Sequence, residues 1–236
     1  MTVNTYVRID QSRALGNVAL PVCDTEKMSS SRTAPAIRTP RRRTVDEGRR
    51  ESLLEQISRE FLSEGFTTIS VDELTRRLHC SKSTIYSVAP TKEQLVVAVT
   101  KRFFRLATTR IEESISGIAD PGLRISAYLK GVGAAMSEQS PTFYRDMVSF
   151  GPTAEVYTLN SAAAARRVQS LIQHGVDSGH FRDINTNFAG HLIGWAIEGI
   201  HSGRLPEDTG LEAGQAFSEL GDILLKGLGR ADSSQG

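Results

Sequence analysis

The segment Ser70–Leu95, "SVDELTRRLHCSKSTIYSVAPTKEQL", contains the start signals of successive helices. Ser70 and Glu73 have the Ser-x-x-Glu spacing of a capping box, which places a helix N-terminus at Ser70. Ser81 has the position and chemistry of a second N-cap, and Pro90 ends that second helix after about two turns. Two short helices separated by so few residues have the proportions of a helix-turn-helix.

A much longer helix is predicted after Pro90. Thr91 and Gln94 form a second capping box, and apolar residues then recur at helical spacing as far as Ile115. Gly117 ends this helix, and the Asp120-Pro121 pair starts the next one, because Pro is favoured at a first helical position. We expect further helices at residues 121–139, 141–150, 153–178, 186–202 and 211–229, separated by Pro141, Gly151-Pro152, Gly179 and the loop "SGRLPEDTG". No segment shows strand alternation, so the predicted fold class is all-α.

The chain before this region divides into an arm and a first helix. Residues 1–44 are rich in Ser, Thr, Pro and Arg and end in "RTPRRR", which predicts a disordered basic arm. Regular structure is expected to begin near Asp46, where Leu53, Ile57 and Phe61 recur at helical spacing, and to stop at Gly65.

Composition excludes several classes of protein. No apolar run approaches the roughly 18 residues of a membrane span, and the N-terminus lacks the pattern of a secretory signal, so we expect a cytoplasmic protein with no membrane partner. Cys23 and Cys80 fit no disulfide or metal-ligand spacing, and we predict no metal and no cofactor. The net charge of +1 conceals a basic half, residues 1–102, and an acidic half, residues 103–236. A basic N-terminal half followed by an acidic C-terminal half indicates nucleic-acid binding. The alternative is that the charge difference is only a property of the solvated surface.

The short helix after Ser81 has the features of a DNA-reading helix. Ile85 is assigned inward, which leaves short polar side chains and one Tyr exposed to base edges and phosphates. Lys92 opens the following helix beside free backbone amides, a suitable place for a phosphate. The predicted DNA-binding residues are Thr68, Ser70, Ser81, Lys82, Ser83, Thr84, Tyr86 and Lys92, each of which is alternatively a cap or a solvated side chain.

The arm is a second candidate contact with DNA. Arg38, Arg41, Arg42 and Arg43 lie just before the first predicted helix, where basic tails contact phosphates or enter the minor groove. The alternative is a polybasic segment that only improves solubility.

The last two long helices carry apolar residues on more than one face, so each needs partners on two sides. One partner is the core of the same chain, and the other is predicted to be the same helix pair of a second copy, which would form a twofold four-helix interface. The alternative is a helix pair buried wholly within one chain. The predicted interface residues are Phe188, Leu192, Trp195, Ile200, Phe217, Leu220 and Leu224.

These motifs resemble those of the TetR family of transcriptional regulators over about residues 46–229. "EGFTTISVDELTRRL" is similar to the family's entry into the helix-turn-helix, and "SKSTIYSVAPTKEQL" is similar to its recognition-helix run. His79 stands where the family usually has Gly, which predicts a positive φ, and Ala89 stands where Phe is common. The resemblance implies a DNA-binding domain at 45–92, a helical ligand-binding and dimerisation domain at 93–229 and a flexible tail at 230–236.

The resemblance also implies a small-molecule effector in the C-terminal domain. Aromatic and methionine side chains lie in the part of the C-terminal domain where the family holds its ligand. Those between Pro141 and Pro152 are the preferred pocket wall. The predicted ligand-binding residues are Tyr128, Met136, Phe143, Tyr144, Met147, Phe150, Tyr157 and Trp195, each of which is alternatively a core residue.

The leading hypothesis is a homodimeric repressor that binds a near-palindromic operator in double-stranded DNA and is released by a mainly apolar effector. The sequence contains no paired carboxylates, nucleophile elbow or phosphate loop, so we predict that it is not an enzyme. His174 and His180, like Glu198 and His201, are not accompanied by further metal ligands. An effector-independent DNA-binding protein, and a helical enzyme or carrier that uses the C-terminal cavity, are the alternatives.

Overall fold

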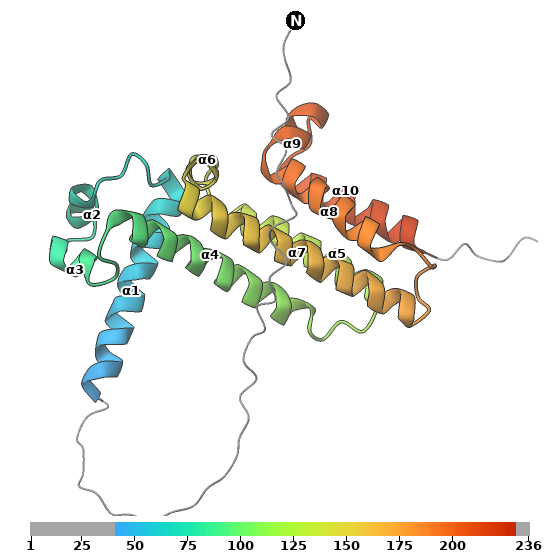
Figure 1. Ribbon diagram of the computed structural model, residues 1–236, viewed down its shortest axis with the longest axis horizontal. Coiled ribbons are helices and arrows are strands. Elements are labelled where there is room, and N and C mark those ends of the chain that lie inside the picture. The colour runs from blue at the N-terminus through green and yellow to red at the C-terminus, as the bar shows by residue number, and fades with distance from the viewer. Residues whose placement is uncertain (1–40, 230–236) are drawn as a thin grey trace, which may run out of the picture. The chain divides into compact units, whose positions relative to one another are not determined.

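The computed structural model describes residues 41–229, with side chains from Glu47 onward, and this part of the chain forms ten helices and no strand (Figure 1). A single isolated bridge joins Phe181 to Gly229. The all-α prediction is therefore confirmed. The helices are α1 (Arg41–Glu64), α2 (Val71–Arg77), α3 (Lys82–Tyr86), α4 (Lys92–Ile115), α5 (Pro121–Met136), α6 (Pro141–Ser149), α7 (Gly151–Asp177), α8 (Thr186–His201), α9 (Arg204–Thr209) and α10 (Ala213–Leu228).

Helix starts follow the capping residues predicted from the sequence. The side chains of Ser70, Ser81, Thr91 and Asp120 each accept a hydrogen bond from the backbone amide three residues ahead. Such a bond satisfies one of the amides that a helix leaves free at its start. The reciprocal half of the predicted box at Ser70 does not form, because the Glu73 carboxylate bonds two arginines instead.

The first of two apolar clusters joins α1, α2 and α3 to the N-terminal half of α4 and to α6. Its largest fully buried side chains include Ile57, Phe61, Leu74, Ile85 and Phe143. The predicted domain boundary between residues 92 and 93 therefore lies inside a continuous core, and α6, from the C-terminal half of the chain, completes it.

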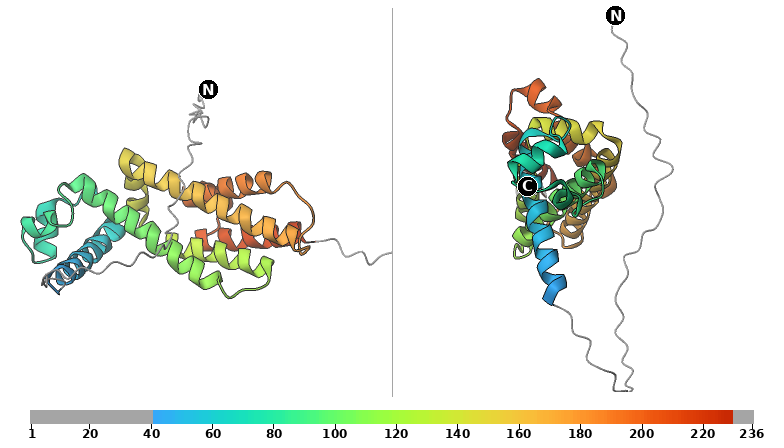
Figure 2. Two further views of the ribbon diagram at one scale, coloured as in Figure 1. Left: turned by 60° about the horizontal axis from the view of Figure 1, so that its bottom comes forward. Right: turned by 90° about the vertical axis from the view of Figure 1, so that its left-hand side faces the viewer.

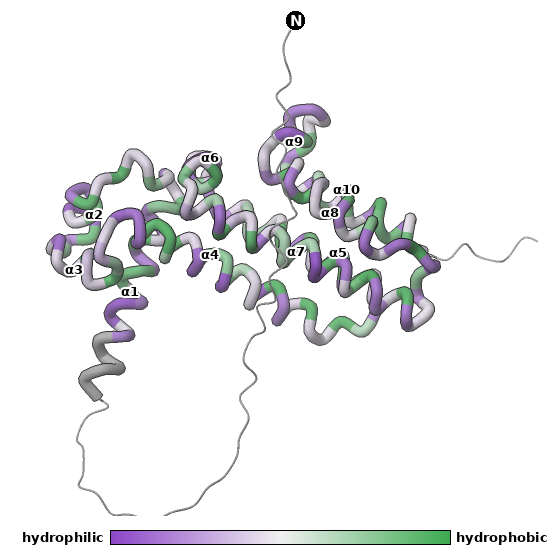
Figure 3. The backbone as a smooth tube through the Cα atoms, in the orientation of Figure 1, coloured by the Kyte–Doolittle hydropathy of each residue, from purple (hydrophilic) through white to green (hydrophobic). Residues whose placement is uncertain are grey.

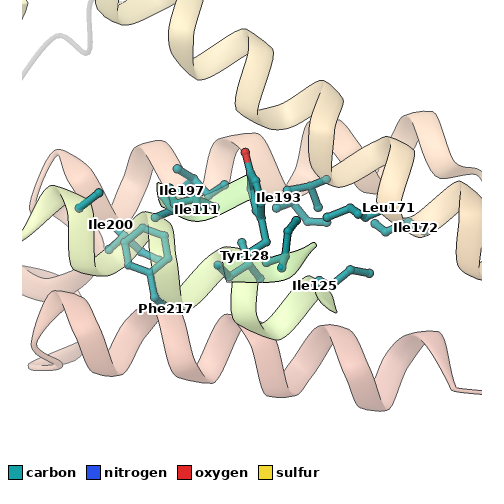
Figure 4. Close-up of a cluster of buried hydrophobic side chains, with 14 of the residues drawn as sticks. Ile111, Ile125, Tyr128, Leu171, Ile172, Ile193, Ile197, Ile200 and Phe217 are labelled. Carbon is teal, nitrogen blue, oxygen red and sulfur yellow. The ribbon is translucent and has the colours of Figure 1, made fainter. Parts of the chain in front are cut away.

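The second cluster fills a bundle of α5, α7, α8, α10 and the C-terminal half of α4, with α7 packed along α8 and α10 along α5 (Figures 1 and 2). Figure 4 shows Ile193, Ile197 and Ile200 of α8 meeting Tyr128 of α5 and Phe217 of α10. Helix α4 contributes residues to both clusters and so connects them. Along the tube of Figure 3, apolar and polar residues alternate at helical spacing, and no helix in residues 41–229 is long and apolar enough to cross a membrane.

Two boundaries differ from the sequence prediction. Helix α1 begins at Arg41 rather than near Asp46, because Arg and Glu favour helix even where no apolar period marks burial. The predicted loop "SGRLPEDTG" contains the short helix α9. Pro206 lies in the first turn of α9, where Pro is tolerated, and Gly203 and Gly210 bound the helix with φ of 79° and 71°.

Candidate functional site

Helices α2 and α3 are joined by a short turn at His79 and Cys80. His79 has a φ of 49°, and it is the only non-glycine residue with positive φ in the described part of the chain. The positive φ predicted for this departure from the family pattern is thus confirmed, and it carries the backbone from α2 into α3.

The inner side of α3 is tightly seated. Ile85 is fully buried, and Val88 and Ala89 after the helix are buried as well. The Arg50 guanidinium of α1 donates to the carbonyl oxygen of Val88 over 2.7 Å. This bond ties the end of the α3 segment to α1, so the small Ala89 side chain does not leave α3 loosely held.

The outer side of α3 carries the predicted DNA-reading side chains, all of which are exposed. The hydroxyl of Ser81 lies 2.7 Å from that of Ser83 and 2.8 Å from that of Thr84, and the Lys82 ammonium lies 2.6 Å from an Asp72 carboxylate oxygen. Surface hydrogen bonds and ion pairs of this kind contribute little to stability. They can therefore be exchanged for contacts with phosphates and base edges.

The remaining predicted contacts lie beside the turn between α1 and α2. Thr68 and Ser70 are exposed, and the Lys92 ammonium at the start of α4 lies 3.4 Å from the carbonyl oxygen of Thr67. Desolvation lowers the pKa of Lys92, although Asp146 counters the effect. The structure thus brings Lys92 to the turn that contains Thr67, which lies 25 residues away along the chain.

The predicted arm contacts cannot be placed. Arg38 lies outside the described residues, and although the backbone of Arg41, Arg42 and Arg43 is helical, their side chains also lie outside what the structure describes. Because α1 includes Arg41, Arg42 and Arg43, the helix begins within the segment predicted to be a disordered arm.

An acidic side chain that the sequence analysis missed holds the turn in place. The Asp146 carboxylate of α6 accepts hydrogen bonds from the backbone amides of Phe66, over 2.7 Å, and Thr67, over 2.8 Å. An Asp in the last turn of a helix is locally unfavourable, because the C-terminal end of the helix dipole is negative. This unfavourable position in the helix is the signal in the sequence that could have indicated a partner for Asp146 outside α6.

A second missed residue, Arg77, locks α2 onto α1. Its guanidinium lies within 2.8 Å of carboxylate oxygens of Glu60 and Glu64 and within 2.7 Å of one of Glu73. Hydrogen bonds from Arg76 and Arg77 hold the pKa of Glu73 well below its usual range. This network joins α2 to the C-terminal part of α1.

The bundle contains a cavity of about 160 Å³ between α4, α5, α7 and α8. Most of its lining is apolar, including Phe103, Phe104 and Ile197, and the Glu112 and Arg167 ion pair, at 2.7 Å, borders it. Burial raises the pKa of Tyr128 to about 12, and the buried Tyr157 hydroxyl donates to a carboxylate oxygen of Glu198. The site can enclose a small, mainly apolar molecule.

The structure distributes the predicted ligand-binding residues over two cavities, the surface and the core. Tyr128, Met136 and Tyr157 line the cavity, and Tyr144 lines a neighbouring one. Trp195 is 70% exposed on α8 and lines neither. The other members of the preferred pocket wall, Phe143, Met147 and Phe150, pack instead into the cluster around Phe66, which was the stated alternative.

The predicted interface residues also separate by burial. Phe188, Leu192 and Trp195 are at least half exposed and lie along one stripe of α8, whereas Leu220 and Leu224 of α10 are partly buried. Ile200 and Phe217 do not reach the surface, since they are 3% and 2% exposed in the core of the chain. The structure adds Ile223, which is 65% exposed on α10.

Metal ligation has no support in the described residues, where no group of three or more His, Cys, Asp or Glu side chains is placed to hold a metal ion.

No family model matches the chain, and no curated protein matches its sequence. Solved structures do match its fold. A protein from Saccharomonospora viridis described as a transcriptional regulator, in complex with choline, matches with a TM-score of 0.67 at 17% identity, covering 78% of this chain and 100% of that one. A TetR-family regulator from Agrobacterium tumefaciens matches with a TM-score of 0.61 at 12% identity, over 78% and 100% of the two chains.

A third structure, AibR in complex with isovaleryl coenzyme A and operator DNA, matches with a TM-score of 0.55 at 16% identity, over 75% of this chain and 98% of that one. At these identities the likeness establishes the fold. The chain has the fold of TetR-family transcriptional regulators, as the resemblance implied.

Proposed function

We propose that this protein is a sequence-specific DNA-binding transcriptional regulator. The observation that carries the proposal is the two-sided construction of α3. Ile85 is fully buried, while Lys82, Ser83, Thr84 and Tyr86 are exposed. The buried side holds α3 against the core, and the exposed side offers hydrogen-bond donors, acceptors and one aromatic ring. A helix of this kind fits a DNA major groove, where base edges are read by such groups.

A second set of polar side chains, placed where a DNA backbone could be held, supports the same function. Ser70 caps the start of α2, with Thr68 two residues before it, and Lys92 is the first residue of α4. The N-terminus of a helix favours a bound phosphate. Phosphate contacts fix the register of the protein on the duplex, whereas the side chains of α3 supply the sequence preference.

The proposed active form is a homodimer joined through α8 and α10. Phe188, Leu192 and Trp195 on α8, with Ile223 on α10, expose large apolar side chains, which a twofold partner would bury against the same face of its own chain. A twofold dimer places one α3 on each half of a near-palindromic operator. Such binding at a promoter would block access to it, so the proposed output is repression in the cytoplasm.

The proposed signal is a small, mainly apolar effector in the cavity between α4, α5, α7 and α8. The cavity volume of about 160 Å³ is close to that of the engineered apolar cavity of about 150 Å³ that binds benzene. The effector therefore has the size of one ring or a short branched chain. The structural neighbours with choline and with isovaleryl coenzyme A show that this fold accommodates ligands.

Release requires that the effector bind the DNA-free form more tightly than the DNA-bound form. Phe103, Phe104 and Ala107 of α4 line the cavity, and Lys92 begins the same helix beside the DNA-binding turn. A shift of α4 on effector binding would displace Lys92 and the elements packed against it.

Selection of bound duplexes from random DNA tests the DNA-binding proposal. We expect a shared near-palindrome for the unmodified chain and a changed consensus for Lys82→Ala. In titrations at several salt concentrations, Lys92→Ala should bind more weakly, with a salt slope reduced by about 1. Lys130→Ala removes an exposed Lys on α5 and serves as the matched control, for which affinity and slope should not change. Recovery of no common sequence by the unmodified chain would refute sequence-specific binding.

A thermal-shift screen of small apolar compounds tests the effector proposal. A true effector raises the melting temperature and weakens operator binding, and Ala107→Met, which fills the cavity, removes both effects. If operator binding is present but no compound acts, the effector-independent alternative is correct.

A further inference from the structure

Two oppositely charged side chains meet on the exposed surface of the helix-turn-helix. Helices α2 and α3 pack against each other (Figure 1), and the Lys82 ammonium of α3 lies 2.6 Å from a carboxylate oxygen of Asp72 on α2. Both side chains are more than half exposed, at 58% and 71%. Asp72 therefore lies beside one of the side chains proposed to read DNA.

A carboxylate at this place is unexpected in a surface that binds DNA. The dipole of α2 favours an acidic residue in its first turn, but Glu73 already supplies one there. Glu73 is paired with Arg76 and Arg77 of its own helix. The ion pair of Asp72 is instead with Lys82 of α3. Because a negative charge that faces phosphates weakens association, Asp72 favours binding only where the DNA offers it a hydrogen-bond donor.

The major groove offers two kinds of donor, the N4 amino group of cytosine and the N6 amino group of adenine. Lys82 distinguishes between them. Its ammonium has three N–H donors, and with one directed at Asp72 two remain. Guanine presents two adjacent acceptors, O6 and N7, whereas in an A·T pair the N6 amino group separates the acceptors N7 and O4. A G·C pair is therefore the better complement of the two side chains.

The spacing of the two charged groups also fits one G·C pair. The guanine O6 and the cytosine N4 are hydrogen-bonded to each other, so they lie about 2.9 Å apart. The Lys82 nitrogen and the Asp72 oxygen lie 2.6 Å apart, so the ammonium can face O6 while the carboxylate faces N4. The ion pair need not break, because a carboxylate has about four lone-pair sites.

We propose that Asp72 and Lys82 together read one G·C pair in each half-site of the operator, with Lys82 donating to guanine and Asp72 accepting from the N4 amino group of cytosine. The inference rests on the proposed function, because it requires α3 to enter the major groove. A base that places an acceptor opposite Asp72 is repelled by the carboxylate. Asp72 thus contributes to specificity by rejecting the wrong base pairs.

Selection of bound duplexes from random DNA by Asp72→Asn, beside the unmodified chain, tests the inference. One G·C pair per half-site of the unmodified consensus should become variable in Asp72→Asn, because an amide both donates and accepts. The other positions of the consensus should be retained. Lys82→Ala should lose the same G·C pair, since the two side chains serve one base pair.

Titrations give the size and the sign of the effect. Replacing that G·C pair by A·T should weaken binding of the unmodified chain at least about fivefold, the equivalent of about 1 kcal/mol for one mismatched pair. The same replacement should change the affinity of Asp72→Asn by less than about twofold. Asp72→Asn should also bind unrelated duplexes at least about twofold more tightly than the unmodified chain, because it has lost a negative charge that faces phosphates. A merely structural role for Asp72 does not produce this gain.

Two further variants complete the design. Asp183→Asn makes the same change of charge at an exposed position between α7 and α8, and it should keep the consensus and the affinities of the unmodified chain. Asp72→Ser also removes the carboxylate and should give the same variable position as Asp72→Asn. Circular dichroism measures whether each variant keeps its helical content.

An unchanged consensus in folded Asp72→Asn or Asp72→Ser would overturn the inference. Loss of a different base pair from the one lost in Lys82→Ala, or an A·T pair at the shared position, would also overturn it. The proposed function fails separately. A shared palindrome that does not depend on Asp72 refutes only this inference, whereas recovery of no common sequence by the unmodified chain refutes both.

Discussion

Replacing Asp146 by Ala should loosen the DNA-binding half of the chain, although Asp146 is not itself a predicted DNA contact. The Asp146 carboxylate accepts from the amides of Phe66 and Thr67 over 2.7 and 2.8 Å. Phe66 is itself buried in the cluster shared by α1 and α6, so loss of the carboxylate leaves its amide without a partner inside the protein.

The magnitude follows from the two bonds. Hydrogen bonds to a charged group contribute about 1.5–3 kcal/mol each, and the exposed one at Thr67 belongs at or below the lower end. Asp146→Ala should therefore lower the free energy of unfolding by about 3 kcal/mol, or roughly 6–12 °C in melting temperature. Asp146→Asn keeps an oxygen acceptor but no charge, and about half of that loss is expected.

Thermal unfolding and amide hydrogen exchange measure the effect. Exchange of the Phe66 and Thr67 amides should accelerate in Asp146→Ala, and Asp208→Ala, at an exposed position on α9, should change neither quantity. An unchanged melting temperature together with unchanged exchange at Phe66 and Thr67 would refute the assignment of Asp146 as the residue that holds this turn.

Three further outcomes are expected. Trp195→Asp places a charge on the exposed apolar face of α8, and analytical ultracentrifugation should show a change from dimer to monomer with helical content retained; a dimer of unchanged affinity would contradict the proposed interface. Because the pKa of His201 falls from 6.5 to about 4 on folding, the unfolded chain takes up the proton first as pH falls below 6.5. Urea titrations should show a loss of about 2 kcal/mol between about pH 7.5 and pH 5 that His201→Leu lacks, and equal pH slopes would refute it. Gly175→Ala brings a Cβ within 2.2 Å of the Phe181 ring and should destabilise by at least about 1–3 kcal/mol, whereas Gly48→Ala, with nothing within 4 Å, should be neutral or stabilising in the same titrations.

The sequence by itself determined the helix-turn-helix and most helix boundaries. Ser70, Ser81 and Thr91 cap helices through their own side chains, and Asp120 with Pro121 starts α5. These signals act within about four residues, so they can be read without knowing what lies across the fold. The positive φ of His79 is a local property of the same kind.

Only the tertiary structure decided which side chains share a surface. Phe143 and Tyr157 are both aromatic residues on neighbouring helices, yet Phe143 packs against Phe66 and Tyr157 lines the cavity. Likewise Trp195 and Ile200 belong to one apolar helix, but the first is 70% exposed and the second 3%. A helix that is apolar on more than one face does not specify which face turns inward.

Long-range polar contacts were equally inaccessible from the sequence. Asp146 lies 80 residues along the chain from Phe66, and Gln139, between α5 and α6, lines a cavity together with His201, the last residue of α8. Their roles arise from burial and from partners brought together by packing, because the energy of a polar group depends on what surrounds it rather than on its neighbours in sequence.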